Sequence, residues 1–169
     1  GQLPFNHCRH SDGVQVYNGG TMSGYLFERS IIGPGFLQGL LLGQSGTQVA
    51  TVNNVTIRDT LFYAAMNASI MGYENIASQN WVIDHVTSVR PIMPGSACVP
   101  GEQWHNIFLR GGGHSVTNSI LVGGCNFTLP SGTIVTNNVQ FGKKGGLDVG
   151  PNTDPQFVDS TNPDLVLRD

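Results

Sequence analysis

The feature that most constrains this chain is a set of short runs, rich in β-branched residues, that recurs along the sequence. Each run has an apolar anchor, then two positions of polar character, then a return to small or apolar residues. The runs occupy residues 25–32, 55–62, 81–86, 116–121 and 134–139. Gly, Asn, Ser, Thr and Pro interrupt the chain between them, and no long segment has the apolar period of 3.6 residues typical of an α-helix. We therefore expect an all-β chain.

Five apolar anchors mark these runs, and their spacing distinguishes the candidate architectures. The anchors are separated by 30, 26, 33 and 19 residues, and repeats of about 20 to 50 residues are typical of solenoids, propellers and arrays. A propeller needs regular blades of four strands, whereas a β-sandwich needs tight hairpins and clean two-residue alternation. Irregular spacing fits coils whose turns carry insertions, so we predict a parallel β-helix, a solenoid of short stacked strands. The anchors are Phe27, Ile57, Ile83, Val116 and Val135.

A second strand is expected before each of the first four anchors. Each of these segments starts with a polar side chain and ends with an apolar pair that faces inward if side chains alternate. The segments are residues 12–16, 38–42, 67–71 and 105–109. Each coil then contains at least two strands joined by a bend, and stacked coils pair their strands in parallel, about 4.8 Å apart. Each coil buries its apolar side chains only against its neighbours, so the fold needs several coils.

Composition excludes several classes of function. Charged residues make up 11% of the chain, and eight Lys and Arg residues stand against a net charge of −3. A protein that follows nucleic-acid phosphates needs clustered Lys and Arg, so we expect no nucleic-acid partner. No apolar run approaches the roughly 20 residues that span a bilayer, so we expect no membrane span. The apolar content of 39% is sufficient for a core.

Cysteines and glycosylation sequons bear on the compartment. Three cysteines are too few for a disulfide scaffold, and one bridge with a free thiol and three buried thiols both remain open. Three Asn-x-Ser/Thr sequons point weakly to a glycosylated, secreted protein, so we expect an extracellular location. The cysteines are Cys8, Cys98 and Cys125, and the sequons begin at Asn54, Asn67 and Asn126.

These repeats resemble those of the right-handed parallel β-helix superfamily, which includes pectate-lyase-like proteins, polysaccharide lyases, glycosidases and phage tailspikes. The resemblance is one of architecture and covers most of the chain from Asp12 onward. Residues 10–15 resemble a segment of secreted β-helix proteins of unsettled function, and residues 154–159 with 163–167 resemble the last coil of such proteins. The resemblance implies a right-handed solenoid.

The ends of the chain depart from that family. No amphipathic capping helix precedes the first coil, and the chain stops directly after the segment that resembles a last coil. A solenoid needs polar end caps to stay soluble. We therefore expect residues 1–169 to form one β-helix domain that lacks its end caps and belongs to a longer chain or to an assembly.

One polar column lies two residues after each anchor, and in-register stacking would place its members one above another. Its two asparagines resemble an amide ladder, and the three charged or ionisable members would form a column of ion pairs. The simple interpretation is a structural ladder at a bend. The alternative is a catalytic pair in which Asp59 orients His85 as a base. The column consists of Arg29, Asp59, His85, Asn118 and Asn137.

A second polar column would form a mixed face for a ligand. Sugars bind to surfaces that combine aromatic rings, amides and carboxylates, and this solenoid face holds the substrate groove in the pectate-lyase-like enzymes that the repeats resemble. The competing interpretation is a polar ladder at a turn, with Leu41, Ile70 and Phe108 lying under a loop. The column consists of Asp12, Gln38, Asn67 and His105, and its neighbours are His10, Gln15, Tyr17, Tyr73, Glu74 and Arg110.

Two routes of polysaccharide cleavage fit these residues. A lyase needs a base and a charge neutraliser beside the uronic carboxylate, roles that suit His10 or His105 and Arg110. A hydrolase needs two carboxylates, for which Asp12 and Glu74 are the candidates. Ca²⁺ is the alternative to arginine as the neutraliser of a lyase, but the sequence has no clustered acidic Ca²⁺ site. It also has no zinc-like spacing of Cys and His, so no cofactor is expected.

Two functional hypotheses follow. The first is a secreted protein that binds or cleaves an acidic polysaccharide along one face of the solenoid, as a lyase or a glycoside hydrolase if it is an enzyme. The second is a non-catalytic structural or adhesive solenoid that stacks end to end into a fibre. The mixed polar face favours the first hypothesis, whereas the uncapped ends favour the second.

Overall fold

The computed structural model describes residues 12–16, 20–33, 36, 38–43, 50–63, 68–72, 78–89, 105–123 and 126–141. Within these ranges the regular secondary structure is all β-strand, and the strand pairings are parallel. The predictions of an all-β chain and of parallel pairing are therefore confirmed. Over the same ranges, no helix has the length and apolar character needed to cross a membrane.

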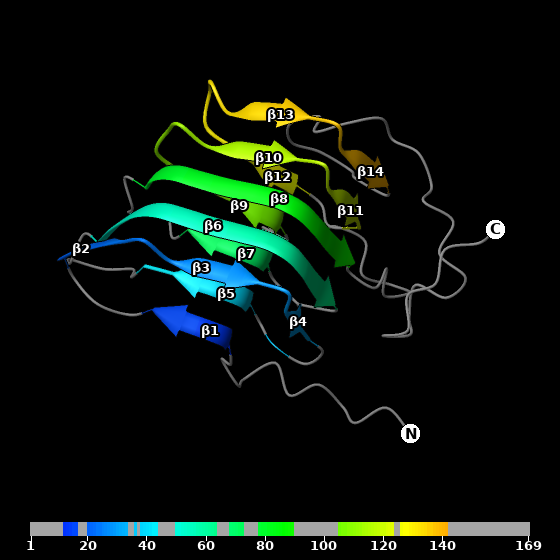
Figure 1. Cartoon of the computed structure of the whole chain (residues 1–169), viewed down its shortest axis with the longest axis horizontal. Coiled ribbons are helices and arrows are strands. Elements are labelled where there is room, and N and C mark those ends of the chain that lie inside the picture. Colours follow the sequence, from blue (N-terminus) through cyan, green and yellow to red (C-terminus); the bar gives the residue numbers. More distant parts are fainter. Residues whose placement is uncertain are drawn as a thin grey trace.

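The strands form two sheets (Figure 1). The smaller sheet has the order β1-β5-β7-β9-β12, and its strands are β1 (Asp12–Val16), β5 (Gln38–Leu42), β7 (Ala68–Gly72), β9 (His105–Phe108) and β12 (Asn126–Thr128). The larger sheet has nine strands, which are β2 (Gly20–Ser23), β3 (Leu26–Glu28), β4 (Ile31–Ile32), β6 (Ala50–Tyr63), β8 (Gln79–Val89), β10 (Ser115–Thr117), β11 (Ile120–Val122), β13 (Ile134–Thr136) and β14 (Val139–Phe141).

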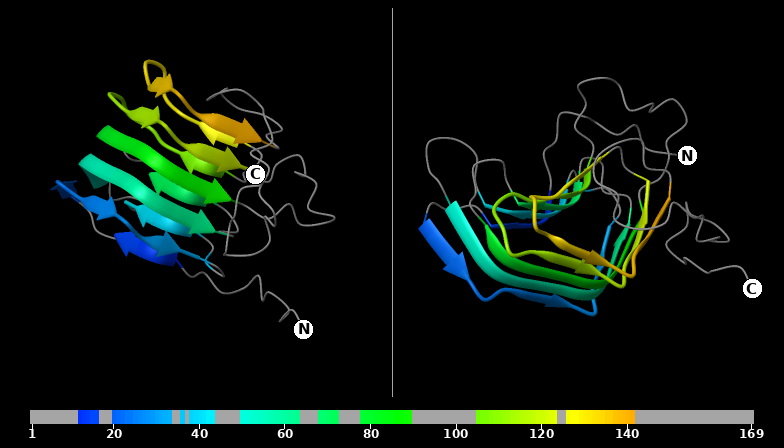
Figure 2. Two further views of the ribbon diagram at one scale, coloured as in Figure 1. Left: turned by 45° about the vertical axis from the view of Figure 1, so that its right-hand side comes forward. Right: turned by 90° about the horizontal axis from the view of Figure 1, so that it is seen from above.

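The chain visits the smaller sheet and then the larger one, five times in succession. We call these successive visits levels 1 to 5: β1–β4, β5–β6, β7–β8, β9–β11 and β12–β14. Figure 2 shows the levels stacked in order, with the larger sheet curving around one side of the interior. The predicted anchors lie in one column, because Phe27 pairs with Ile57, Ile57 with Ile83, Ile83 with Val116, and Val116 with Val135.

At every level of the larger sheet the backbone is left-handed at two equivalent positions, which make two bends. The first bend consists of Gly24, Asn54, Asn80, Gly113 and Gly132, with φ from 53° to 83°. The second bend consists of Arg29, Asp59, His85, Asn118 and Asn137, with φ from 49° to 55°. At every level the second bend follows the first by five residues. The variation in repeat length therefore lies outside this segment.

The interior between the sheets is apolar, because alternate side chains of both sheets point into it. Ile57 and Ile83 are fully buried there together with Leu40 of the smaller sheet. The two sheets also complement each other in size. A Cβ atom on Gly39 would lie 2.8 Å from Cδ1 of Phe62, so the glycine makes room for the aromatic ring.

Polar side chains enter the interior where both sheets supply partners. The Ser88 hydroxyl lies 2.7 Å from Oγ of Ser69 and is also hydrogen-bonded to Oδ1 of Asn106. The Asn106 amide donates to the Val122 carbonyl at 3.3 Å. Buried polar groups need such partners, and this network joins levels 3 and 4 across the core.

The register of the smaller sheet differs from the predicted one at one level. Ala68, and not Asn67, pairs with Gln38 and His105. The reason is that Ile70 belongs to the core, which fixes the alternation of β7 and shifts the alignment by one residue. Three strand segments were also not predicted, which are β2, β12 and the first half of β6.

The burial of the anchor column can be tested with two adjacent residues on opposite faces of β8. Ile83 is fully buried, whereas Val82 is 41% exposed. We expect Ile83→Ala to lower the free energy of unfolding by about 2–5 kcal/mol, and Val82→Ala to lower it by less than about 1 kcal/mol. Urea unfolding followed by circular dichroism measures both. Equal losses in the two variants would contradict the predicted inward register.

Candidate functional site

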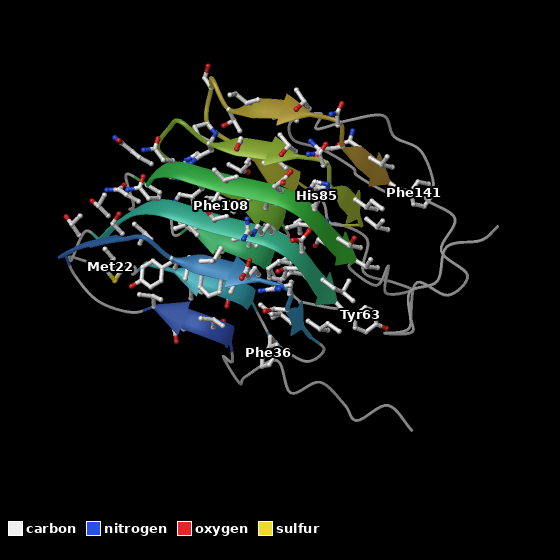
Figure 3. All side chains as sticks on the ribbon, in the orientation of Figure 1. Met22, Phe36, Tyr63, His85, Phe108 and Phe141 are labelled. Atoms are coloured by element: carbon white, nitrogen blue, oxygen red, sulfur yellow. The ribbon has the colours of Figure 1, made fainter. Side chains whose placement is uncertain are left out.

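The outward side of the larger sheet carries a row of polar side chains along the second bend. Figure 3 shows them on the ribbon, with His85 labelled. We call this row the outer polar face. It consists of the residues just before the bend, Glu28, Arg58, Asp84, Thr117 and Thr136, and of the bend residues Arg29, Asp59, His85, Asn118 and Asn137.

A repeated hydrogen bond fixes the second bend. The residue after the bend is Ser30, Thr60 or Ser119 at levels 1, 2 and 4, and its hydroxyl donates to the carbonyl two residues earlier at 2.9, 2.8 and 2.7 Å. Serine and threonine commonly make such local bonds to the backbone. The bond closes the bend. The side chains just before the bend stand on the outward side of the strand because each follows an inward anchor such as Ile57 or Ile83.

The first charged group of this face is centred on Glu28. Arg58 donates to Oε2 of Glu28 from Nε at 2.9 Å and from a terminal nitrogen at 2.6 Å, and Arg29 donates to Oε1 at 2.9 Å. These hydrogen bonds, that from Arg58 foremost, lower the pKa of Glu28. Because the arginine side chains are 77% and 50% exposed, the pairs contribute little to stability.

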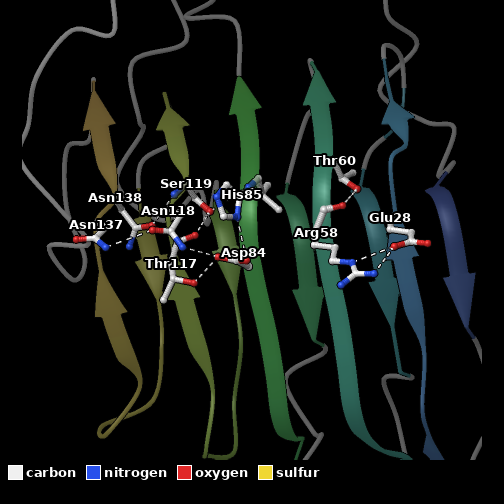
Figure 4. A network of polar contacts seen from close by, with 11 residues as sticks. Glu28, Arg58, Thr60, Asp84, His85, Thr117, Asn118, Ser119, Asn137 and Asn138 are labelled. Atoms are coloured by element: carbon white, nitrogen blue, oxygen red, sulfur yellow. Dashed lines mark hydrogen bonds and ion pairs between the residues drawn. The ribbon is translucent and has the colours of Figure 1, made fainter.

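The second group is centred on Asp84 (Figure 4). Oδ1 of Asp84 accepts hydrogen bonds from the Thr117 hydroxyl at 2.7 Å and from the Asn118 amide at 2.8 Å, while Oδ2 accepts one from Nδ1 of His85 at 2.9 Å. The Thr117 bond is the largest of the causes that lower the pKa of Asp84 to about 2. With Nδ1 committed to Asp84, Nε2 of a neutral His85 carries the lone pair.

The predicted amide ladder is present, because Asn137 donates to Oδ1 of Asn118 at 3.3 Å. The predicted ion pairs within the column are wrong. Arg29 pairs with Glu28, and His85 pairs with Asp84 and not with Asp59. The carboxylates that make contacts stand one position before the bend. There the strands lie in direct register, and Asp84 is the partner of Thr117.

The second predicted column lies in the smaller sheet, where Asp12, Gln38 and His105 follow one another in register with Ala68 between the last two. Gln38 and His105 are each only 3% exposed. The backbone N–H of Gln38 donates to Oδ1 of Asp12 at 3.3 Å, and Nδ1 of His105 is hydrogen-bonded to the Thr128 hydroxyl at 3.2 Å. This column therefore does not offer His105 to solvent as an open base.

The neighbours of this column differ in exposure. Arg110 and Gln15 are exposed, and the Arg110 guanidinium lies 5.7 Å from the ring centre of Phe108. Leu41 and Phe108 are buried, which agrees with the interpretation of a covered turn. The other predicted members lie outside the described residues: His10, Tyr17, Asn67, Tyr73 and Glu74. The three cysteines, Cys8, Cys98 and Cys125, also lie outside them.

Sequence reasoning missed His114, which is 1% exposed. Its Nδ1 accepts the backbone N–H of Trp81 at 3.1 Å, and its Nε2 donates to the Arg110 carbonyl at 3.0 Å. Burial lowers the pKa of His114. One signal in the sequence could have identified it. His114 directly follows the first-bend residue Gly113, just as the buried Trp81 directly follows the first-bend residue Asn80 one level earlier.

In the described part of the chain, no three His, Cys, Asp or Glu side chains gather where they could hold a metal ion. No protein-family model matches the chain, and comparisons with curated proteins and with solved structures give no match. What the outer polar face can do is therefore argued from its own chemistry. It presents carboxylates, guanidinium groups, amides and an imidazole to solvent, all of which bind hydroxyl groups well.

The Asp84 network predicts a specific acid dependence of stability. The pKa of Asp84 is lowered from 3.8 to about 2. The contribution of Asp84 to the free energy of unfolding is therefore present above pH 3.8 and is lost as the pH falls towards 2. We expect Asp84→Asn to flatten the fall of the urea midpoint over this range. In the control Asp59→Asn, at the neighbouring level, the urea midpoint should fall with pH as it does in the wild type. An Asp84→Asn profile as steep as that of the wild type would contradict the assignment.

Proposed function

We propose that the chain is a right-handed parallel β-helix that binds a polysaccharide along the outer polar face. The helical architecture is supported by the five alternations between two sheets and by parallel register from level to level. Right-handedness is supported by a general rule, since crossover connections between parallel strands are right-handed in about 98% of cases. The polysaccharide ligand is argued from the second bend.

The observation that carries the proposal is a contrast between the two bends. Every first-bend residue is Gly or Asn, the residues that adopt the left-handed conformation most readily. The second bend keeps Arg29, Asp59 and His85 at φ values of 49–50°. A left-handed residue other than Gly costs roughly 1–3 kcal/mol, least for Asn, Asp and His, so Arg29 is the most costly.

This cost is not offset by burial, because the Arg29 and His85 side chains are 77% and 60% exposed. Strained residues that persist where a cheaper residue would fit are characteristic of functional sites. Asn118 and Asn137 occupy the same bend at levels 4 and 5, so asparagine fits there. Because Asp and His adopt this conformation more readily than Arg, the strain argument applies to Arg29. We infer that the Arg29 side chain is kept for a ligand, together with the exposed Asp59 and His85 of the same bend.

The spacing of the face suits a polymer. Neighbouring levels repeat about every 4.8 Å, so a chain with repeating units can meet a hydrogen-bonding group at each level. The positive charges are already paired, Arg58 and Arg29 with Glu28. Recognition would thus rest on hydroxyl groups hydrogen-bonded to amides, carboxylates and an imidazole, and acidity of the polysaccharide is not required.

Binding fits this geometry better than cleavage. A glycosidase needs a general acid, a carboxylic acid that is still protonated near the working pH. Asp84, with a pKa of about 2, remains ionised at neutral pH. A lyase needs an accessible base beside a charge neutraliser. His105 is buried in the smaller sheet, and the exposed His85 stands on level 3, whereas Arg29 and Arg58 of levels 1 and 2 are paired with Glu28. We therefore propose a binding module.

The test replaces the second-bend side chains by the residue that suits the bend. In the double variant Arg29→Asn/His85→Asn we expect polysaccharide affinity to fall by about tenfold or more, since each lost hydrogen bond contributes about 1 kcal/mol. The urea midpoint should stay the same or rise. Affinity electrophoresis against uronate polymers and neutral polymers measures binding.

The matched control is Gln15→Asn, an exposed amide on the smaller sheet, which should bind as the wild type does. Wild-type affinity in the double variant would refute the role of the second bend. If the wild-type protein bound no polymer and formed filaments visible by electron microscopy, the alternative of a structural, end-stacking solenoid would replace the proposal.

A further inference from the structure

His114 joins level 3 to level 4 from inside the molecule, and both of its ring nitrogens are engaged. Nδ1 accepts the backbone N–H of Trp81 on β8 at 3.1 Å, so it must carry a lone pair. Nε2 donates to the carbonyl of Arg110 at 3.0 Å, so it carries the proton. A carbonyl cannot donate and an amide N–H cannot accept. The contacts therefore require the neutral tautomer with hydrogen on Nε2.

Protonation of the ring would place a second hydrogen on Nδ1, facing the Trp81 N–H. Two donors would then oppose each other in a site from which water is excluded, since His114 is 1% exposed and Trp81 is fully buried. An unsatisfied buried donor and a buried charge are both unfavourable. The ring must leave its site, or the Trp81 bond must open, when the imidazole is charged.

The segment between Arg110 and His114 is the part that could respond. It is a glycine turn, and Gly111 and Gly113 have φ values of 97° and 68°. Two further bonds hold it, from Asn80 N–H to the Gly112 carbonyl and from Gly112 N–H to the Ser78 carbonyl, each at 3.1 Å. Among the described residues three hydrogen bonds therefore hold this turn to level 3, and His114 makes one of them. Its second bond, to the Arg110 carbonyl, closes the turn on itself.

The charged surroundings do not offset protonation. On its own segment the nearest charged residue is Arg110, whose guanidinium is exposed. On β8 the titratable residues are Asp84 and His85, which lie on the outer polar face and not beside the ring. β13 contributes a backbone N–H, that of Ile134, to the His114 carbonyl. No described carboxylate faces the imidazole, which agrees with burial as the main cause of its lowered pKa.

We propose that His114 is an acid-sensitive latch, whose protonation releases the Arg110–Gly113 turn from level 3. The latch is closed above pH 6.5, the ordinary value for histidine, because the folded state holds the neutral ring. It opens as the pH falls through the lower value of the folded state, so the protection that it confers is lost on acidification and not on raising the pH. This device is independent of any ligand on the outer polar face.

The test is hydrogen exchange of the Trp81 backbone amide, followed by NMR from pH 7.5 to 4.5 and corrected for the intrinsic pH dependence of exchange. We expect its protection to fall at least tenfold below pH 6.5 in the wild type. In His114→Gln, whose amide can accept from Trp81 and donate to Arg110, protection should stay constant. The control His85→Gln should keep the wild-type transition.

Unchanged Trp81 protection in the wild type, or an equal transition in His114→Gln, would overturn the latch. If His114→Gln fails to fold, the ring itself is followed in the wild type by its ¹⁵N chemical shifts. These should report the tautomer with hydrogen on Nε2 and a midpoint below 6.5. The opposite tautomer, or a midpoint at or above 6.5, would also overturn the proposal.

Discussion

The structure depends on a backbone constraint, the left-handed conformation at two positions five residues apart in every level of the larger sheet. Each left-handed residue redirects the strand, and the constant separation means that every level bends at the same two places. Parallel strands that bend together can keep their hydrogen bonds on both sides of the bend, as β6 and β8 do from Asn53 to Tyr63. Insertions outside this segment change the repeat length without disturbing the register, which is why anchors separated by 19 or by 33 residues pair equally well.

The polar side chains of the two bends have different roles. At the first bend Asn80 donates to Oδ1 of Asn54 at 3.2 Å, and Asn54 donates to the Ser23 hydroxyl at 2.8 Å, so its amides are used to join levels. At the second bend the contacts between levels are made largely by the preceding residues, such as Arg58 with Glu28. At levels 1 and 3 the bend side chains Arg29 and His85 make hydrogen bonds only within their own level. The bend side chains of levels 1 to 3 remain directed to solvent. A surface built this way can vary its bend residues without weakening the stack.

Sequence reasoning identified the anchor column because Ile57, Ile83 and Val116 stand in similar local patterns, and burial of such residues is what the fold requires. It missed the first bend because Gly and Asn are frequent throughout the chain, so only the repeated five-residue distance, as from Asn80 to His85, identifies it. It paired His85 with Asp59 because in-register stacking places the bend residues in one column. The contact with Asp84 depends on side-chain direction at a left-handed residue, which spacing does not encode. Burial of His105 depends on how the outward side of the smaller sheet is covered, which the strand pattern does not encode either.

The junction of levels 3 and 4 shows why polar contacts are placed inside an otherwise apolar stack. Its anchors are 33 residues apart, the longest separation in the series, and a longer loop is entropically costlier to close. Apolar side chains such as Ile83 and Val116 would pack against any similar level, so they do little to select the partner. The polar contacts at this junction include Ser88 with Asn106 in the core, Trp81 with His114 at the first bend, and Asp84 with Thr117 and Asn118 at the second. A slip of one level would set Phe62, the strand partner of Ser88, beside Asn106. The buried Asn106 side chain would then lose the Ser88 hydroxyl, at the free-energy cost of an unsatisfied polar group. The polar contacts thus select the register, while the apolar column supplies the stability.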